Sequence, residues 1–139
     1  MIKKTLSQII IFLIGAIVYP CIELVYKNGN THWTMALVGG IALLSIVDIN
    51  FILKKNNILL RVITATLIVT TIEFIAGMII NKLCGLRVWD YTNCDFNLYG
   101  QICLKFSFYW SILCLAVILF IECILLIYNK TYKNKQKEI

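Results

Sequence analysis

Charged residues and proline are scarce in this sequence. Only 14% of its 139 residues are charged and one is a proline, whereas 60% are hydrophobic and the mean hydropathy is +0.85. A water-soluble domain of this size could not bury so much apolar surface, so lipid is the expected solvent for most of the chain. The hydrophilic segments are too short for a separate folded module, and we therefore predict a single transmembrane domain over residues 1–139.

Motifs for nucleotide, metal and nucleic-acid chemistry are also missing. No Gly-x-x-x-x-Gly-Lys-Ser/Thr phosphate loop occurs, so any use of ATP would need a separate ATPase subunit. The six cysteines form no Cys-x-x-Cys pair and His32 is the only histidine, which argues against a zinc site. We expect no metal, no other cofactor and no nucleic-acid partner. No nucleophile–base pair stands at a recognisable spacing, so neither a catalytic residue nor an enzyme activity is predicted.

Four apolar windows run through the chain, at about residues 6–26, 33–53, 58–80 and 106–128. Each has the roughly 20 residues that a helix needs to cross a bilayer. The alternating pattern of a membrane β-barrel is absent, so helices must satisfy the backbone polar groups. The predicted fold class is all-α, a polytopic membrane protein with four transmembrane helices. We expect the first helix to be retained, because no small-x-small cleavage site follows it.

Lysine and arginine residues are distributed unevenly between the two ends of these windows. Most of them would share the side of both termini: Lys3, Lys4, Lys54, Lys55, Arg61, Lys130, Lys133, Lys135 and Lys137. The other side would hold only Lys27, Lys82, Arg87 and Lys105. The positive-inside rule then places both termini in the cytoplasm of a bacterial cell, with the basic tail 129–139 as a topology anchor.

The three connections differ in length and composition. Residues 27–32 and 54–57 are short and rich in asparagine, glycine or lysine, which predicts antiparallel neighbouring helices. Residues 81–105 are too many for a passive turn and carry several large apolar side chains. We predict a structured external loop there, which either caps the helices or dips into the membrane. Its three cysteines could stay free or form a disulfide: Cys84, Cys94 and Cys103.

Each apolar window contains a single carboxylate, namely Glu23, Asp48, Glu73 or Glu122. An acid at the centre of a membrane helix costs about 2.5 to 3.5 kcal/mol on insertion scales, so four of them indicate a polar interior. By helical rise, Glu23 and Glu73 would form an outer pair, and Asp48 and Glu122 an inner pair. We expect all four side chains to point inward, toward one another.

Glu73 has the most continuous polar surroundings. Steps of three and four residues place small and polar side chains along one face of the third helix: Thr66, Thr70, Glu73, Gly77 and Asn81. Three interpretations of the acids remain open, namely structural contacts between helices, a cation or proton pathway, and a site for a polar or cationic ligand. The candidate residues are Glu73, Glu23, Asp48, Glu122, Thr70 and Asn81.

The loop carries a dense set of aromatic, charged and glycine residues: Arg87, Trp89, Asp90, Tyr91, Asn97, Gly100 and Gln101. Arg87 and Asp90 can pair, and Gly100 permits a backbone turn. Trp89 and Tyr91 suit a membrane interface, so the loop is either an aromatic belt with a local ion pair or a lid over the outer mouth of the polar interior.

The order Glu73, Arg87-x-Trp89-Asp90-Tyr91, Asn97-x-x-Gly100-Gln101-Ile102-Cys103 and Trp110 resembles the ABC-transporter type IV family of small bacterial permease-like membrane proteins. The motif covers about residues 70–115. The resemblance implies a multi-spanning bacterial membrane protein with this loop as its signature.

The function that we expect is that of a permease-like protein of the bacterial inner membrane, a transporter component for a cation or polar solute. Its partners would be the lipid bilayer, a second copy or another membrane subunit and, if ATP drives transport, a separate ATPase subunit. The alternative is a non-transporting scaffold, sensor or accessory subunit in which the buried acids are structural.

Overall fold

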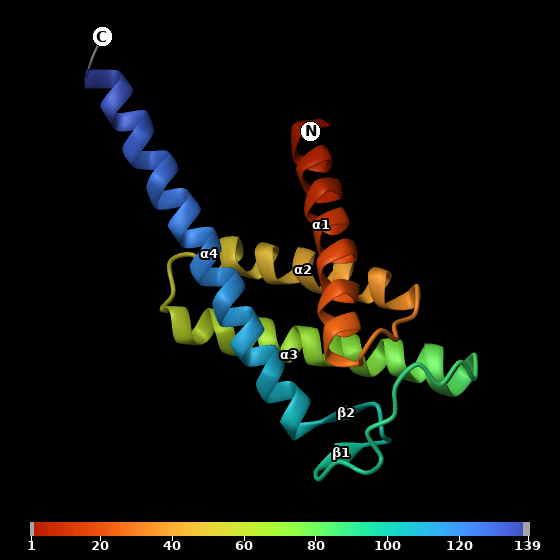
Figure 1. Ribbon diagram of the computed structural model, residues 1–139. Helices are drawn as coiled ribbons and strands as arrows, with labels where there is room; N and C mark the ends of the chain where they lie inside the picture. Colours follow the sequence, from red (N-terminus) through yellow and green to blue (C-terminus); the bar gives the residue numbers. More distant parts are fainter. Residues whose placement is uncertain (1, 138–139) are drawn as a thin grey trace.

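The computed structural model describes residues 2–137, with side chains described for residues 4–133. Its elements in chain order are α1 (Ile2–Tyr26), α2 (Thr34–Ile52), α3 (Ile58–Gly77), the π-helix η1 (Met78–Leu83), β1 (Asn97–Leu98), β2 (Ile102–Cys103) and α4 (Leu104–Lys137) (Figure 1). Four helical segments are long and apolar enough to cross a membrane. The predicted all-α class with four transmembrane helices is therefore confirmed.

The last helix and the loop differ in extent from the prediction. Helix α4 runs on to Lys137, so most of the segment 129–139 continues the helix. Its lysines and its one glutamine are good helix formers, and neither glycine nor proline interrupts them. Three of the lysines counted toward the cytoplasmic side, Lys3, Lys135 and Lys137, lie outside the range of described side chains. The loop contains a short antiparallel strand pair, in which Asn97 is opposite Cys103, that the sequence did not predict.

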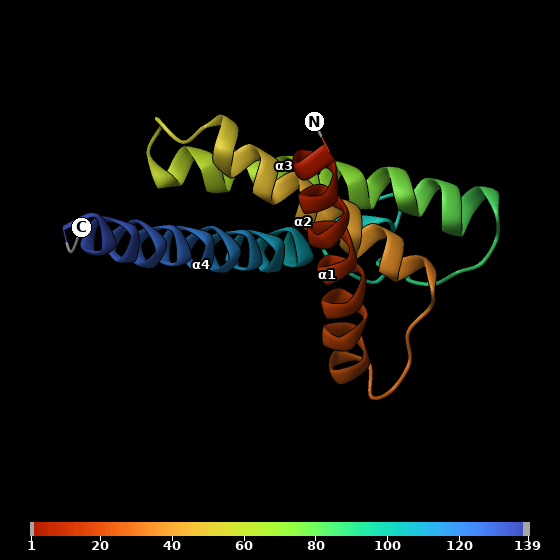
Figure 2. The ribbon, with the colours of Figure 1, turned by 90° about the horizontal axis from the view of Figure 1, so that it is seen from above.

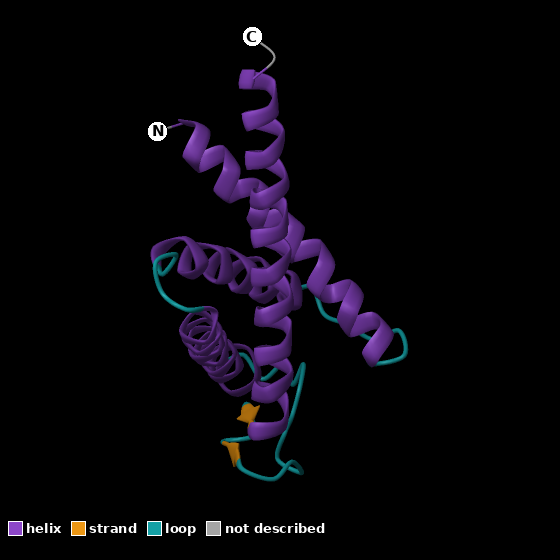
Figure 3. Cartoon of the chain, turned by 90° about the vertical axis from the view of Figure 1, so that its left-hand side faces the viewer, coloured by secondary structure: helices purple, strands orange, loops and turns teal. Residues whose placement is uncertain are grey.

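Successive helices run in opposite senses, but they are not all parallel to one axis. Helices α2 and α3 lie side by side, whereas α1 and α4 cross this pair obliquely (Figures 1 and 2). Both termini lie toward the upper part of Figure 1, and the strands β1 and β2 lie at the opposite end. Figure 3 shows these strands beside the first turn of α4. The loop thus folds under the helices at one end of the molecule.

The buried core is formed by α2, α3 and α4. It consists of small and branched side chains together with one indole: Ala42, Ile46, Ala65, Val69, Trp110, Cys114 and Ile118. Helix α1 packs against the outside of this core through α2. The contact is made by glycines, because a Cβ at Gly15 would lie 2.5 Å from the carbonyl oxygen of Gly39. Small residues of this kind let membrane helices approach closely.

The glycine contact between α1 and α2 predicts a packing defect in Gly39→Ala. The new methyl would meet the Cβ of Tyr19 and the carbonyl oxygen of Gly15, and backbone atoms cannot move aside cheaply. We expect the free energy of unfolding in detergent to fall by about 1 to 3 kcal/mol, as for other overpacked sites. Leu37→Ala, on the exposed face of the same helix, is the control. Equal stability of Gly39→Ala and the wild type would contradict this packing.

Candidate functional site: the Glu73 pocket

Glu73 lies on α3 and is 3% exposed. The Tyr91 hydroxyl donates a hydrogen bond of 3.1 Å to its Oε1. The Trp110 indole Nε1–H donates one of 2.9 Å to its Oε2. The two donors come from the loop and from α4, so three parts of the chain converge on one carboxyl group. Both donors are uncharged, and each carboxyl oxygen of Glu73 accepts one hydrogen bond.

Tyr91 belongs to the loop but is inserted between the helices. Burial, and then the Glu73 carboxylate beside it, raise the pKa of the Tyr91 phenol above its ordinary range. The hydroxyl therefore stays protonated and remains a donor to Glu73.

A cavity of about 400 Å³ opens beside Glu73, between α1, α4 and the loop. Its walls are mainly aromatic, with contributions from Tyr19, Tyr26, Tyr91, Phe106, Tyr109 and Trp110. The charged residues in the lining are Glu23, Lys27 and Glu73. We call this cavity the Glu73 pocket.

Two ring stacks hold the walls of the Glu73 pocket in place. Tyr19 and Trp110 stack with their centroids 5.2 Å apart, which joins α1 to α4. Tyr91 and Phe106 stack at 4.4 Å, which joins the loop to α4. In each stack one ring also donates a hydrogen bond to Glu73. The ring positions are therefore fixed both by packing and by the carboxylate.

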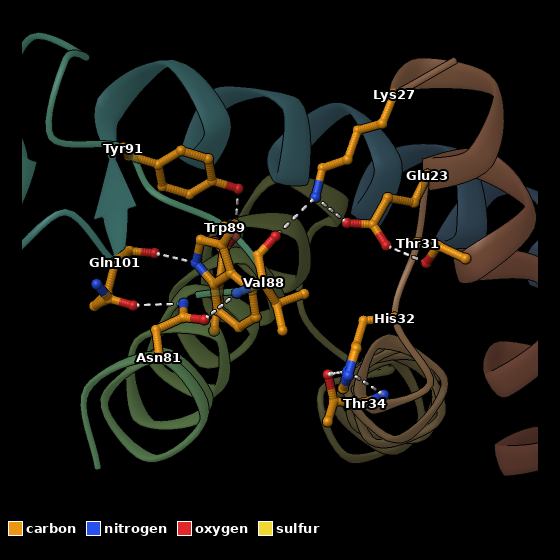
Figure 4. A network of polar contacts seen from close by, with 11 residues as sticks. Glu23, Lys27, Thr31, His32, Thr34, Asn81, Val88, Trp89, Tyr91 and Gln101 are labelled. Atoms are coloured by element: carbon orange, nitrogen blue, oxygen red, sulfur yellow. Dashed lines mark hydrogen bonds and ion pairs between the residues drawn. The ribbon is translucent and has the colours of Figure 1, made fainter. Parts of the chain in front are cut away.

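Glu23 shares the pocket with Glu73 but has charged and polar partners of its own. Lys27 Nζ lies 2.5 Å from its Oε1, and the Thr31 hydroxyl donates to its Oε2 at 2.5 Å (Figure 4). Lys27 also reaches the carbonyl oxygen of Val88 at 3.4 Å. The expected outer pair is thus brought to one pocket, and the charge of Glu23 is balanced by Lys27.

The end of the polar stripe on α3 holds the loop. The Asn81 side chain donates to Gln101 Oε1 at 2.8 Å and accepts from the backbone N–H of Val88 at 2.7 Å (Figure 4). The Trp89 indole donates to the carbonyl oxygen of Gln101 at 3.0 Å. A Cβ at Gly77 would lie 2.5 Å from Gln101 Oε1, so glycine leaves room for this contact. Asn81 sits in the π-helix η1, a local irregularity often found at functional sites.

Two side chains of the loop motif have partners that differ from those of an aromatic belt with a local ion pair. Trp89 is not exposed on the protein surface but is buried against Gly77 and bonded to Gln101. The Arg87–Asp90 ion pair is not among the salt bridges of the described side chains. Asp90 instead accepts from the backbone N–H of Thr92, and hydrogen bonds from Thr92 lower the pKa of that carboxyl.

Gly100 and Asn97 shape the turn between the two strands. Gly100 has φ +68°, and a Cβ there would lie 2.6 Å from Thr92 Cγ2. The Asn97 side chain accepts from the N–H of Gly100 at 3.0 Å and donates to the carbonyl oxygens of Thr92 and Cys94. The carbonyl of Gly100 in turn accepts from the N–H of Tyr91 at 2.8 Å, which sets the position of the tyrosine.

The expected inner pair of acids does not form. Glu122 accepts from Arg61 at 2.7 Å and from the Asn50 side chain at 3.3 Å. Asp48 is exposed instead of pointing inward. The buried face of α2 carries Ile46 and Asn50, and a step of two residues turns a helix by about 200°, so Asp48 faces away. Asn50 therefore takes the inner position that the sequence analysis gave to Asp48.

Thr70 stands one turn before Glu73 on the polar stripe. Its hydroxyl oxygen is the only buried side-chain polar atom without a hydrogen-bond partner in the described part of the chain. Thr66, a further turn back, donates to the carbonyl oxygen of Val62. In the same part of the chain, no three His, Cys, Asp or Glu side chains are grouped so as to hold a metal ion.

Sequence reasoning missed several partners of the acids. Lys27 stands four residues after Glu23, a spacing that pairs side chains along a helix and could have been noticed. Arg61 and Asn50 lie far from Glu122 in sequence, so no local signal links them. The sequence also offered no reason to assign Phe106 to a pocket, because aromatic residues are common at the ends of membrane helices.

The six cysteines are free, and two of them are neighbours. The thiols of Cys94 and Cys103 lie close enough to influence each other. Desolvation, followed by the interaction with Cys103, raises the pKa of the Cys94 thiol.

The fold and the site define a multi-pass membrane protein with four membrane-crossing helices and a loop folded onto their polar stripe. The family model described as "Putative ABC-transporter type IV" matches residues 10–139, and the chain belongs to this family. No match was found among curated proteins or solved structures.

The contacts of Gln101 predict that Gln101→Ala loosens the loop. The change removes the acceptor for Asn81 and leaves that buried amide unpaired, which costs about 1 to 3 kcal/mol. We expect faster amide hydrogen exchange throughout residues 84–103. Asn93→Ala, at an exposed loop position, should leave the exchange unchanged. Wild-type exchange rates in Gln101→Ala would contradict this role of the side chain.

The thiol pair predicts which disulfide the loop can form. With oxidised glutathione as oxidant, we expect a Cys94–Cys103 disulfide and two released glutathione thiols. Peptide mapping by mass spectrometry identifies the bond. A disulfide involving Cys84 as the main product would contradict the observed pairing of thiols.

Proposed function

We propose that the chain is a permease-like membrane component that binds a cation in the Glu73 pocket, with Glu73 as the binding carboxylate. The observation that carries this proposal is the environment of Glu73. It is buried, both oxygens accept from uncharged donors, and a cavity opens beside it. A cation in that cavity would balance the charge of Glu73.

The ion pairs of the described side chains leave Glu73 without a positively charged partner. Two salt bridges occur among them, Lys27–Glu23 and Arg61–Glu122, and neither includes Glu73. A buried ionised carboxylate without a counter-charge costs several kcal/mol, whereas pairing with a cation or a proton removes much of that cost. Glu73 can therefore bind and release a cation or a proton without breaking an ion pair of the fold.

The loop contributes Tyr91 to the lining of the Glu73 pocket, and it lies at one end of the molecule. By the positive-inside rule this end faces the outside of a bacterial cell, and both termini lie in the cytoplasm. Membership of a transporter-related family supports a transport role and agrees with a partner subunit. An ATPase subunit, if one drives the process, would have to meet the cytoplasmic end.

The alternative is a scaffold or accessory subunit in which the acids are structural. The observation that favours it is the pairing of Glu23 and Glu122 with basic residues. In such a protein the bonds from Tyr91 and Trp110 to Glu73 would serve only to hold the loop and α4.

Cation-dependent stability tests the proposal. A ligand at 100 times its Kd stabilises the folded state by about 2.7 kcal/mol. We expect at least one monovalent cation, from a panel of sodium, potassium and alkylammonium ions, to stabilise the purified protein in detergent. Glu73→Gln should abolish this response while the protein remains folded and abundant in membranes.

Asp48→Asn is the matched control, because Asp48 is an exposed acid on another membrane-crossing helix and does not line the Glu73 pocket. It should respond to cations like the wild type. Two results together would contradict cation binding and favour the scaffold. No cation would stabilise the wild type, and Glu73→Gln would be less stable than the wild type.

A further inference from the structure

We propose, on the basis of the proposed function, that the cation bound in the Glu73 pocket is a monovalent organic cation, of the quaternary ammonium type. It would lie between the aromatic walls with its charge next to Glu73. The sequence and the family name assign no substrate to this chain, so the chemistry of the pocket is the guide.

The size of the pocket is the first argument. Its volume is about 400 Å³, within the range of about 300 to 1,000 Å³ typical of small-molecule sites. A single water occupies about 30 Å³, so a bare inorganic ion would leave most of this space to be filled by solvent against aromatic rings. A compact organic molecule would fill it and bury apolar surface at the same time.

The composition of the walls is the second argument. Hard inorganic cations take six or more oxygen ligands, as calcium does. The Glu73 pocket offers one carboxylate without a counter-ion, and both of its oxygens already accept a hydrogen bond. What the pocket has in quantity is aromatic surface: besides the two stacked pairs, Tyr26 and Tyr109 line it without a stacked partner. Aromatic faces bind cations with weakly hydrated charge, and quaternary ammonium groups are their characteristic ligands.

The charge balance is the third argument, and it fixes the valence. Lys27 neutralises Glu23, which leaves Glu73 as the acid in the lining without a basic partner. A cation with a single positive charge matches that vacancy. A divalent cation would require the Glu23–Lys27 ion pair to break, although Lys27 lies 2.5 Å from Glu23.

The surroundings of the Glu73 pocket also suit a ligand with apolar groups. An apolar cavity of about 370 Å³ lies between α1, α2 and α4. It shares Tyr19, Ile22, Trp110 and Leu113 with the Glu73 pocket, so the two spaces adjoin. Alkyl or aryl substituents of the cation can extend into this second cavity, where water has no polar partners.

Binding of benzyltrimethylammonium to the purified full-length protein tests the inference. Its uncharged carbon isostere, neopentylbenzene, has the same shape and controls for simple apolar burial. We expect calorimetry to show binding of the cation to the wild type and binding of the isostere that is at least tenfold weaker. Glu73→Gln should reduce binding of the cation by a similar factor.

Tyr109→Leu, at a pocket-lining ring without a stacked partner, separates the aromatic contribution from apolar bulk. It should weaken binding of the cation roughly fivefold to thirtyfold, the factor that corresponds to losing a desolvated cation–π contact. Phe108→Leu, at an exposed position of the same helix, should leave the affinity unchanged. The isostere comparison uses only the wild-type protein, so it decides the matter even if Tyr109→Leu does not fold.

The outcomes separate this inference from the proposed function. Equal affinity for benzyltrimethylammonium and neopentylbenzene would overturn the organic-cation assignment. So would stabilisation by sodium or potassium that depends on Glu73 while the organic cation does not bind, and in that case the proposed function would stand. If neither inorganic nor organic cations bind, both are overturned.

Discussion

Two helices and the long loop meet at the carboxylate of Glu73. Helix α3 carries the acid, α4 supplies the indole donor of Trp110, and the loop supplies the hydroxyl of Tyr91. An acid surrounded by apolar side chains is tolerated only when its oxygens are hydrogen-bonded. The loop therefore has to fold back onto the helices. The bonds from Asn81 to Gln101 and Val88 hold it there.

The membrane acids differ in their partners, although the sequence presents them alike. Glu122 of α4 is paired with Arg61 of α3, which ties these two helices together, whereas Glu23 is paired with Lys27, four residues later in the chain. Glu73 has only neutral donors among the described residues, and it borders an aromatic pocket. Glu73 is therefore the acid in the pocket lining that has no basic partner. Both the proposed cation site and the proposed class of ligand depend on this unpaired acid.

Local patterns in the sequence predicted some of these features and not others. Hydropathy alone located the four helices, and helical spacing alone aligned Glu73 with its polar stripe. The rotation of α2 depends instead on where Gly39 packs against α1, so Asp48 could not be distinguished from Asn50 as the inward residue. From the sequence, Trp89 is interpreted as an interfacial aromatic residue. Its hydrogen bond to the backbone of Gln101 could not be predicted, because it forms only in the folded loop.

A double-mutant cycle between Glu73→Gln and Tyr91→Phe tests the central claim most directly. It measures whether the loop and α3 are coupled through this hydrogen bond, using free energies of unfolding in detergent for the two single variants, the double variant and the wild type. A hydrogen bond to a charged group is worth about 1.5 to 3 kcal/mol, so the account predicts a coupling energy of at least about 1 kcal/mol. Additive effects, within about 0.5 kcal/mol, would contradict it.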